Sequence, residues 1–327
     1  MRINGNVIGA NNRPTSNTAN GVWRWDASTM HRLYNQFPTY AAAAAAAFQG
    51  STSGYTSGGD NTIDKFPFAT NANATDVGDL TQARAGPAGQ SSSASGYTTG
   101  GYGVSNVIEK FPFSANANST DVGDLSVQRY SSAGQSSSSN GYTSSGHDGS
   151  LATNIIDKFP FASNANATDV GDIQERKRYM AGQSSTVSGY TSGGNDQFGA
   201  TDNNTIDKFP FASNANATNV GDLATGRNGL AGQSSTTHGY SSGGSEPTII
   251  GRIDKFSFAT DSNATNVGNL TVARRTSAGQ SSTASGYATA GPPSSNIIEK
   301  FPFASDANAT DVGDLTVARS YAAGQQV

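Results

Sequence analysis

Short apolar stretches separated by turn-forming residues recur along most of the chain. In one representative unit the stretches occupy residues 206–212, 220–225, 231–235 and 239–244, and an Asn- and Ser-rich string fills residues 213–218. Runs of this length, bounded by Gly, Asn and Ser, are typical of β-strands joined by tight turns. The pattern therefore predicts four short strands in each unit.

The same sequence unit occurs six times along the chain. Its Lys-Phe-x-Phe core begins at Lys65, Lys110, Lys158, Lys208, Lys255 and Lys300. A period of 45 to 50 residues indicates a repeat architecture. Each unit holds few large apolar residues and could not bury an adequate core alone. Four strands in each of six units predict an all-β fold, a six-bladed β-propeller over residues 51–327.

The two ends of the repeat region predict how the ring closes. Residues 320–327 repeat the first strand of a unit, and the first unit has no good first strand of its own. We expect the C-terminal run to pair with the strand that contains Gly54 and Tyr55, which would hide two open sheet edges. Pro67 lacks an amide hydrogen, so we expect it to mark a bulge or the end of its strand.

Composition narrows the choice of partners. The net charge of −4 argues against binding to nucleic acid or another polyanion. The chain has no cysteine, which excludes disulfides and thiolate metal sites. No apolar run is long enough to span a membrane, and the first residues lack the apolar core of a secretory signal. We therefore expect neither membrane insertion nor a cleaved leader.

The repeat resembles the kelch repeat. The resemblance covers residues 51–327 and depends on an aromatic third strand, an Arg after the fourth strand and Gly-Gly doublets that end the second strand. The doublets are Gly58-Gly59, Gly100-Gly101, Gly193-Gly194 and Gly243-Gly244. Two copies lack the doublet, and the usual kelch Trp is absent. The resemblance implies a divergent, kelch-like propeller.

Residues 1–50 differ from the repeats and contain both tryptophans. A short helix is predicted over about residues 27–35. The phrase Ile8-Gly9, followed by Gly21-Val22-Trp23 and later by Pro38-Thr39, resembles the opening of many bacteriophage tail and other virion proteins. The six-fold unit also resembles repeats of marine phage virion proteins.

This resemblance implies a virion structural protein, most simply part of the tail. Residues 1–50, with Trp23, Trp25 and Tyr34, would attach the chain to other virion proteins. The chain is also expected to form a homo-oligomer in the particle. The propeller would then face outward and contact the host surface. The alternative is a passive decoration or filament subunit without a ligand.

Two repeated motifs suggest chemistry but have simpler interpretations. Asn-x-Ser/Thr sequons occur at Asn73, Asn118, Asn166, Asn216, Asn263 and Asn308. We interpret them as turns held by a side-chain hydrogen bond rather than as glycan sites. The Asp-Val-Gly-Asp strings offer too few oxygen ligands for calcium, so we expect their carboxylates to cap turns and strands.

The repeated charges are expected to join blades. We expect an Arg after the fourth strand in every copy, as at Arg84, and an acid precedes each core Lys, as at Asp64. A catalytic group is needed once per site rather than six times, so ion pairs between blades are the simpler interpretation. We predict no catalytic residue, metal or cofactor. A Ser-His-acid triad stays open because it assembles in space, and a glycan-active enzyme would need two carboxylates in the central channel.

Differences between the six copies locate a candidate ligand site. The segments between strands two and three and between strands four and one vary most. Because strands alternate in direction, both segments should emerge on one face of the propeller. Loops on a rigid scaffold commonly carry binding residues. The predicted ligand-binding residues on this variable face are Tyr102, His147, Asp148, Arg178, Tyr179, Asp196, Phe198, Glu246 and Arg252. Aromatic and hydrogen-bonding side chains suit a glycan or a protein; drift of solvated loops is the alternative.

Overall fold

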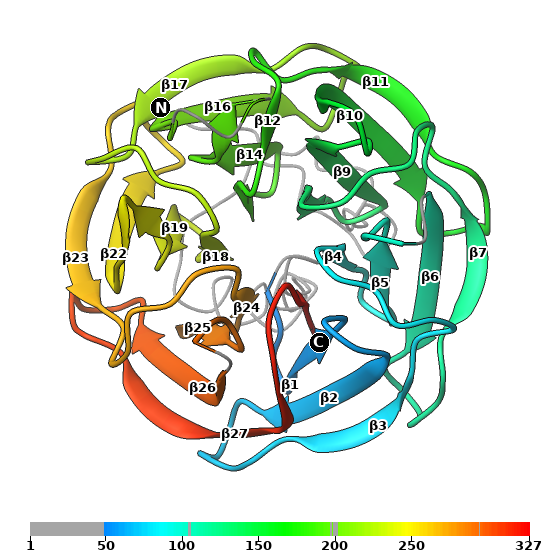
Figure 1. The fold of residues 1–327 in the computed structure, drawn as a ribbon, viewed down its shortest axis with the longest axis horizontal. Helices are drawn as coiled ribbons and strands as arrows, with labels where there is room; N and C mark the ends of the chain where they lie inside the picture. Colours follow the sequence, from blue (N-terminus) through cyan, green and yellow to red (C-terminus); the bar gives the residue numbers. More distant parts are fainter. Residues whose placement is uncertain (1–48, 104–105, 197, 199–201, 294) are drawn as a thin grey trace, which may run out of the picture. The chain divides into compact units, whose positions relative to one another are not determined.

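A computed structural model describes residues 49–327 except 104–105, 197, 199–201 and 294. Within that part of the chain every regular element is a β-strand and none is a helix. Six four-stranded antiparallel sheets stand around a central axis as the blades of a propeller (Figure 1). The prediction of an all-β, six-bladed propeller is confirmed. The predicted helix at residues 27–35 lies outside the described residues.

The four strands of each blade follow one another from the axis outward. Blade 1 contains β28 (Ala323–Gln326), β1 (Ser53–Ser57), β2 (Thr62–Pro67) and β3 (Thr75–Asp79). Blade 2 contains β4 (Ala88–Ser91), β5 (Ser95–Thr99), β6 (Val107–Pro112) and β7 (Thr120–Asp124). Blade 3 contains β8 (Ala133–Ser136), β9 (Asn140–His147), β10 (Ala152–Pro160) and β11 (Thr168–Asp172).

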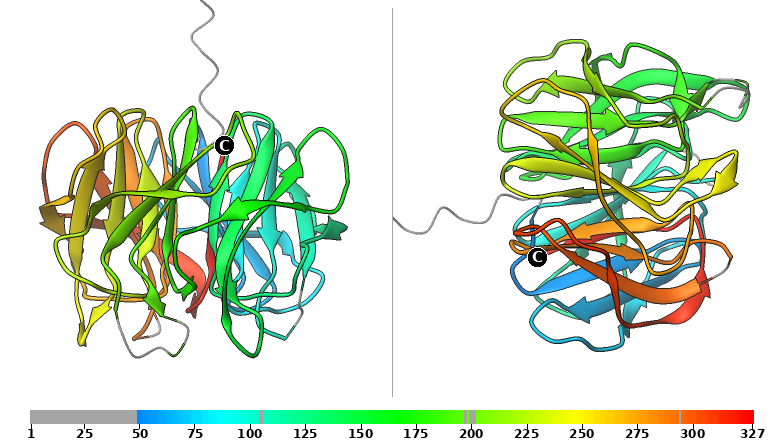
Figure 2. Two further views of the ribbon diagram at one scale, coloured as in Figure 1. Left: turned by 90° about the horizontal axis from the view of Figure 1, so that it is seen from above. Right: turned by 90° about the vertical axis from the view of Figure 1, so that its left-hand side faces the viewer.

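The remaining blades have the same order. Blade 4 contains β13 (Ala181–Ser184), β14 (Ser188–Ser192), β16 (Thr205–Pro210) and β17 (Thr218–Asp222). Blade 5 contains β18 (Ala231–Ser234), β19 (His238–Ser242), β22 (Arg252–Ser257) and β23 (Thr265–Asn269). Blade 6 contains β24 (Ala278–Ser281), β25 (Ser285–Thr289), β26 (Ser295–Pro302) and β27 (Thr310–Arg319). Two short ladders lie in the connecting loops: β12 (Lys177–Arg178) with β15 (Asn195–Asp196), and β20 (Ser245–Glu246) with β21 (Thr248–Ile249). Seen from the side, the strands run between two opposite faces of the propeller, and the loops gather on those faces (Figure 2).

The C-terminal strand closes the ring as expected. β28 pairs antiparallel with β1, so that Gly54 faces Gln326 and Ser57 faces Ala323. The last strand of the chain thereby completes the first blade, and both edges that an open ring would expose are paired. Pro67 is the last residue of β2, where the missing amide hydrogen interrupts no ladder. The prediction of a strand end at this proline is confirmed.

An aromatic cluster between neighbouring blades explains the Gly-Tyr and Phe-x-Phe motifs. Gly54 faces Phe66 across the β1–β2 ladder, and a Cβ on Gly54 would lie 2.3 Å from the Phe66 ring. The ring can occupy that space only because residue 54 has no side chain. Phe66 and Phe68 then pack against Tyr287 of blade 6 at centroid distances of 5.5 and 4.8 Å. The same arrangement recurs at all six blade interfaces.

The innermost strands approach one another through glycine. Along these strands the alternating Ala and Gln side chains enter the blade interfaces, whereas Gly and Ser face the axis, with Gln326 in place of Ser in β28. A Cβ on Gly182 would lie 2.3 Å from the carbonyl oxygen of Gly134 in the preceding blade. Gln183 donates to the Tyr240 carbonyl of the next blade at 3.0 Å. The repeated Ala-Gly-Gln-Ser sequence therefore builds a narrow hub.

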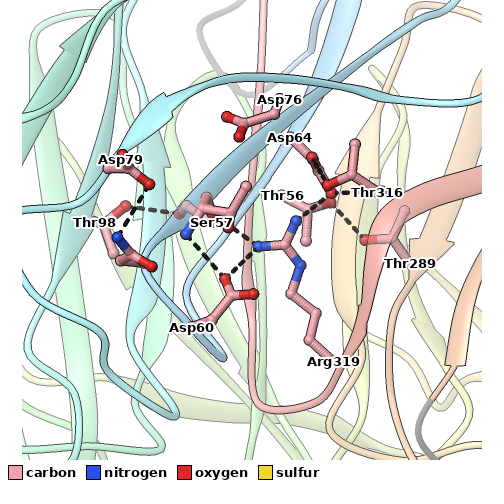
Figure 3. A network of polar contacts seen from close by, with 12 residues as sticks. Thr56, Ser57, Asp60, Asp64, Asp76, Asp79, Thr98, Thr289, Thr316 and Arg319 are labelled. Atoms are coloured by element: carbon pink, nitrogen blue, oxygen red, sulfur yellow. Dashed lines mark hydrogen bonds and ion pairs between the residues drawn. The ribbon is translucent and has the colours of Figure 1, made fainter.

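Six buried ion pairs join each blade to the next. They are Arg84–Glu109, Arg129–Asp157, Lys177–Asp207, Arg227–Asp254, Arg274–Glu299 and Arg319–Asp64. Figure 3 shows the closing pair, in which Arg319 contacts both Asp64 and Asp60 and the Thr316 hydroxyl also donates to Asp64. The expectation of blade-to-blade pairs is confirmed. The expectation of an Arg in every copy is wrong, because Lys177 takes this place between blades 3 and 4.

The sequons and the Asp-Val-Gly-Asp strings have structural roles. The Asn118 side-chain oxygen accepts a hydrogen bond from the Asp79 amide of the preceding blade at 3.0 Å, and the other five sequons repeat this contact. The expectation of a hydrogen bond confined to one turn is therefore wrong, since the bond crosses a blade interface. The Asp76 carboxylate accepts from the Gly78 amide at 3.1 Å, which is the expected local capping.

Candidate functional site

The two variable segments of each copy lie on one face of the propeller, as strand alternation predicts. Loop residues that precede an inner strand form bridges with residues at the end of a second strand or just after it. These bridges are Ala85 with Tyr102, Tyr130 with His147, and Asn228 with Ser245. The β12–β15 ladder makes the same contact between Arg178 and Asn195. Paired loops therefore form the variable face at blades 2 to 5.

A closed ring of six backbone hydrogen bonds surrounds the axis on this face. Each residue donates its amide to the carbonyl of the corresponding residue one blade earlier, at 2.6 to 3.0 Å. In order around the axis the residues are Tyr321, Gly86, Ser131, Tyr179, Gly229 and Thr276. All six have φ between 51 and 69°, the left-handed region that favours glycine. We call these residues the axial ring.

Two tyrosines of the axial ring meet across the axis. Tyr179 and Tyr321 occupy opposite positions, three steps apart in the ring, yet their side-chain centroids are only 6.2 Å apart. The remaining ring members are Gly, Ser or Thr, whose small side chains leave room for this contact. The two phenol rings therefore cover the centre of the variable face.

Further aromatic side chains continue outward from this pair on one side. The Arg178 guanidinium lies 5.4 Å from the Tyr179 ring centroid. Tyr130 packs on His147 at 5.2 Å and meets Tyr102 edge to face, also at 5.2 Å. Tyr102 is 67% exposed. We call this group the aromatic arc; its members are Tyr102, Tyr130, His147, Arg178, Tyr179 and Tyr321.

Burial and charge tune the titratable groups of the arc. Burial raises the pKa of Tyr130, and the neighbouring Tyr179 adds to the rise, while Arg178 opposes it through charge and a hydrogen bond. Burial and the Arg178 charge lower the pKa of His147, and the nearby Asp148 opposes this. The arc near neutral pH therefore presents an uncharged imidazole and phenol beside the guanidinium of Arg178.

The Asp148 side chain forms hydrogen bonds within its own loop. Its carboxylate accepts hydrogen bonds from the Ser150 and Leu151 amides at 2.7 and 2.8 Å, which lower its pKa. The His147 ring nitrogen Nδ1 accepts from the Gly149 amide at 3.0 Å. Both side chains thus shape the loop between β9 and β10, and of the two only His147 belongs to the arc, through its contact with Tyr130.

The other predicted ligand-binding residues lie outside the arc. The Asp196 carboxylate accepts from the Phe198 amide at 3.1 Å, and Phe198 is 73% exposed. Glu246 and Arg252 of blade 5 both contact the Thr225 hydroxyl, in the loop that follows blade 4. The structure therefore gathers Tyr102, His147, Arg178 and Tyr179 but not these four. The predicted attachment residues Trp23, Trp25 and Tyr34 lie outside the described residues.

Sequence reasoning missed Tyr130 and Tyr321. Both belong to the segment between strands four and one, which was identified as variable, but neither was selected. Aligning the six copies on the axial ring gives Gly, Ser, Tyr, Gly, Thr and Tyr, and this places Tyr321 beside Tyr179 in the comparison. The signal for Tyr321 was therefore present, whereas the contact of Tyr130 with His147 depends on the bridge between two loops.

The opposite face carries the turns between strands one and two and between strands three and four, which hardly vary. We call it the constant face. The first described residues lie here: Gly50 donates its amide to the Ser281 carbonyl at 2.7 Å, and Gln49 reaches the Ser234 carbonyl at 3.2 Å. Gln49 is buried. The chain therefore joins the propeller at the face opposite the aromatic arc.

Small and polar residues line the central channel. An axial cavity of about 50 Å³ is lined by Gly and Ser with Gln90, Gln135 and Gln326. No Asp or Glu is among the residues that line this cavity. In the described part of the chain, no three His, Asp or Glu residues are grouped to hold a metal ion. No helix capable of crossing a membrane occurs there either.

These features define the chain as a six-bladed β-propeller with one constant and one variable face. No model of a known protein family matches the sequence, and no curated protein is significantly similar to it.

Proposed function

We propose that this protein is a structural component of a bacteriophage virion, associated with the tail. In this proposal residues 1–50 attach the chain to other virion proteins, and the chain forms a homo-oligomer in the particle. A kelch-like propeller presents its variable face to the host surface. The resemblance of the first 50 residues and of the repeats to virion proteins supports the origin. The Gly-Gly doublets support kinship with kelch repeats.

One observation carries the binding role: the chain joins the propeller on one face and the aromatic arc lies on the other. Gln49 and Gly50 contact the constant face, whereas Tyr102 and Tyr179 belong to the variable face. A protein held by its N-terminal segment can therefore expose its variable loops to solvent. Loops on such a rigid scaffold are well suited to recognition.

The repeated charges support a binding role over a catalytic one. Six acids that precede the core lysines, such as Asp157, are each held in an ion pair with the preceding blade. They stabilise the ring and are buried away from any substrate. We therefore propose that the protein is not an enzyme and uses no cofactor.

A cryo-EM reconstruction of the native particle tests the proposal. We expect six-bladed density on the tail, with the constant face toward the particle and the loops at residues 147–154 and 195–204 in solvent. Purified full-length chain should also reduce adsorption of the particle to its host. Burial of these loops against identical subunits would favour a passive filament or decoration protein and would overturn the binding role.

A further inference from the structure

The axial ring contains two tyrosines, although its backbone hydrogen bonds and left-handed conformation do not require an aromatic side chain. Gly86 and Gly229 adopt the left-handed conformation without a side-chain penalty, whereas Tyr179 and Tyr321 adopt it at φ of 61 and 58°. For a bulky residue this conformation is a steric outlier. Strain of this kind is concentrated at functional sites. Tyr179 and Tyr321 thus place a strained backbone and two aromatic side chains at the centre of the variable face, which points to a ligand.

The arc around these tyrosines has the chemistry of a carbohydrate site. Tyr102, Tyr179 and Tyr321 offer rigid aromatic surfaces for the apolar faces of sugar rings, and their hydroxyls can exchange hydrogen bonds with sugar hydroxyls. The ring contacts form two groups, Tyr179 with Tyr321 at 6.2 Å over the axis and Tyr102 with Tyr130 and His147 at 5.2 Å. Arg178 lies between the two groups, beside Tyr179 and Tyr130. An elongated oligosaccharide suits such a surface better than a single sugar.

The positive charge of Arg178 favours an acidic carbohydrate over a neutral one. Arg178 brings a guanidinium to the middle of the arc, beside Tyr179 and Tyr130. The Asp148 carboxylate, in the loop after His147, accepts two backbone amides of its own turn and lies near Arg176. None of the ion pairs in the described part of the chain involves Arg178, so the arc carries a positive group without a carboxylate partner although the whole chain carries a net charge of −4. A guanidinium is suited to bind a carboxylate through two parallel hydrogen bonds.

We propose that the aromatic arc binds an acidic oligosaccharide, with sugar rings on Tyr102, Tyr179 and Tyr321 and a sugar carboxylate on Arg178. This inference rests on the proposed function, since a host-surface polysaccharide would supply the ligand.

Binding of the purified full-length chain to an array of carboxylated oligosaccharides and their carboxyl-reduced counterparts tests the inference. We expect the chain to bind at least one carboxylated glycan at least tenfold more tightly than its reduced counterpart. Arg178→Ala and Tyr179→Gly should each weaken that binding at least tenfold. Val187→Ala should leave it within twofold, because Val187 is 66% exposed in a turn of the constant face.

Tyr179→Gly separates binding from folding. Two other copies already have Gly at this position of the axial ring, so the thermal midpoint should not fall. Binding to neutral glycans alone, to no carboxylated glycan, or equally by wild type and Tyr179→Gly would overturn the inference.

A host-cell experiment distinguishes failure of this inference from failure of the proposed function. Wild type should bind host cells after protease treatment but not after periodate oxidation of their glycans. Binding that survives periodate and is lost with protease would indicate a protein receptor, and would overturn the glycan site while leaving host recognition intact. No binding to host cells would overturn the proposed function, whereas the array result concerns the arc alone.

Discussion

The buried pair of Arg129 and Asp157 can be removed one partner at a time or both together. Both side chains are 0% exposed, and the Asp157 carboxylate also accepts the Ser126 amide and hydroxyl at 2.9 and 2.7 Å. Burial lowers the pKa of Arg129 and the Asp157 charge opposes this shift. Because the pair joins blade 2 to blade 3, its removal should lower the free energy of unfolding of the whole propeller.

Arg129→Met leaves the Asp157 carboxylate buried without its cation. Breaking a buried pair in this way costs about 3–5 kcal/mol, a large share of the roughly 5–15 kcal/mol that stabilises a typical domain. The double variant Arg129→Met/Asp157→Leu removes both charges, and the exposed Ser126 can turn to water. We expect the double variant to be more stable than the single variant by about 2 kcal/mol or more.

Urea unfolding followed by tyrosine fluorescence and circular dichroism measures these differences. The exposed pair Lys208–Asp261 provides the matched control, because Lys208→Met should cost less than about 1 kcal/mol. A loss below about 1 kcal/mol for Arg129→Met, or a double variant no more stable than the single one, would refute the argument that these pairs are desolvated charges held by each other.

Three further predictions concern the hub, one blade interface and the aromatic clusters. Gly182→Ala should lower the free energy of unfolding by about 3 kcal/mol or more in urea titrations, because the new methyl would meet the Gly134 carbonyl at 2.3 Å. Ala224→Thr should raise the free energy of unfolding by about 1 kcal/mol, measured as a higher urea midpoint, by supplying the hydroxyl that the buried Asp254 oxygen Oδ1 lacks; this hydroxyl is supplied elsewhere by Thr81, Ser126, Thr271 and Thr316. Burial raises the pKa of Tyr55, Tyr240 and Tyr287 to about 12. Folding therefore favours the protonated form of these tyrosines. The stability that this contributes is fully present below about pH 10 and should be lost as the pH rises toward 12. Ultraviolet absorption follows the ionisation of tyrosine, and circular dichroism follows unfolding in the same titration.

Each of these predictions has a clear contrary result. Gly251→Ala, whose methyl would stand 3.3 Å from the nearest atom, should be far milder than Gly182→Ala, and equal losses would contradict the tight hub. An unchanged midpoint for Ala224→Thr would mean that Arg252, 3.6 Å from the Asp254 oxygen, already satisfies it. Ionisation of all tyrosines near pH 10 without unfolding would show that the clusters are open to water.

Much of the fold could be predicted from the repeats. Six copies of a four-strand pattern imply six blades, and the extra copy of the first strand at residues 320–327 implies that the ends of the chain meet in one blade. The basic residue after each fourth strand and the acid before each core Lys implied ion pairs between blades. These inferences hold because strand length, turn chemistry and repetition are local properties that sequence records directly.

The candidate site could be predicted only in part. Strand alternation placed Tyr102, His147, Arg178 and Tyr179 on one face, but it could not tell which of them lie close together. Asp196, Phe198, Glu246 and Arg252 share that face and lie outside the arc. Alternation determines the face on which a loop emerges, whereas its distance from the axis depends on how each loop pairs with its neighbour.

The sequence by itself thus determined the number of blades, the strand order, the way the ring closes and the face that varies. Only the tertiary structure decided that Tyr179 and Tyr321, from opposite sides of the ring, meet over the axis, and that each sequon binds the preceding blade. The reason is geometric. Closing six blades around a hub of glycines brings distant segments within a few ångströms of one axis, and no local pattern in the chain encodes that distance.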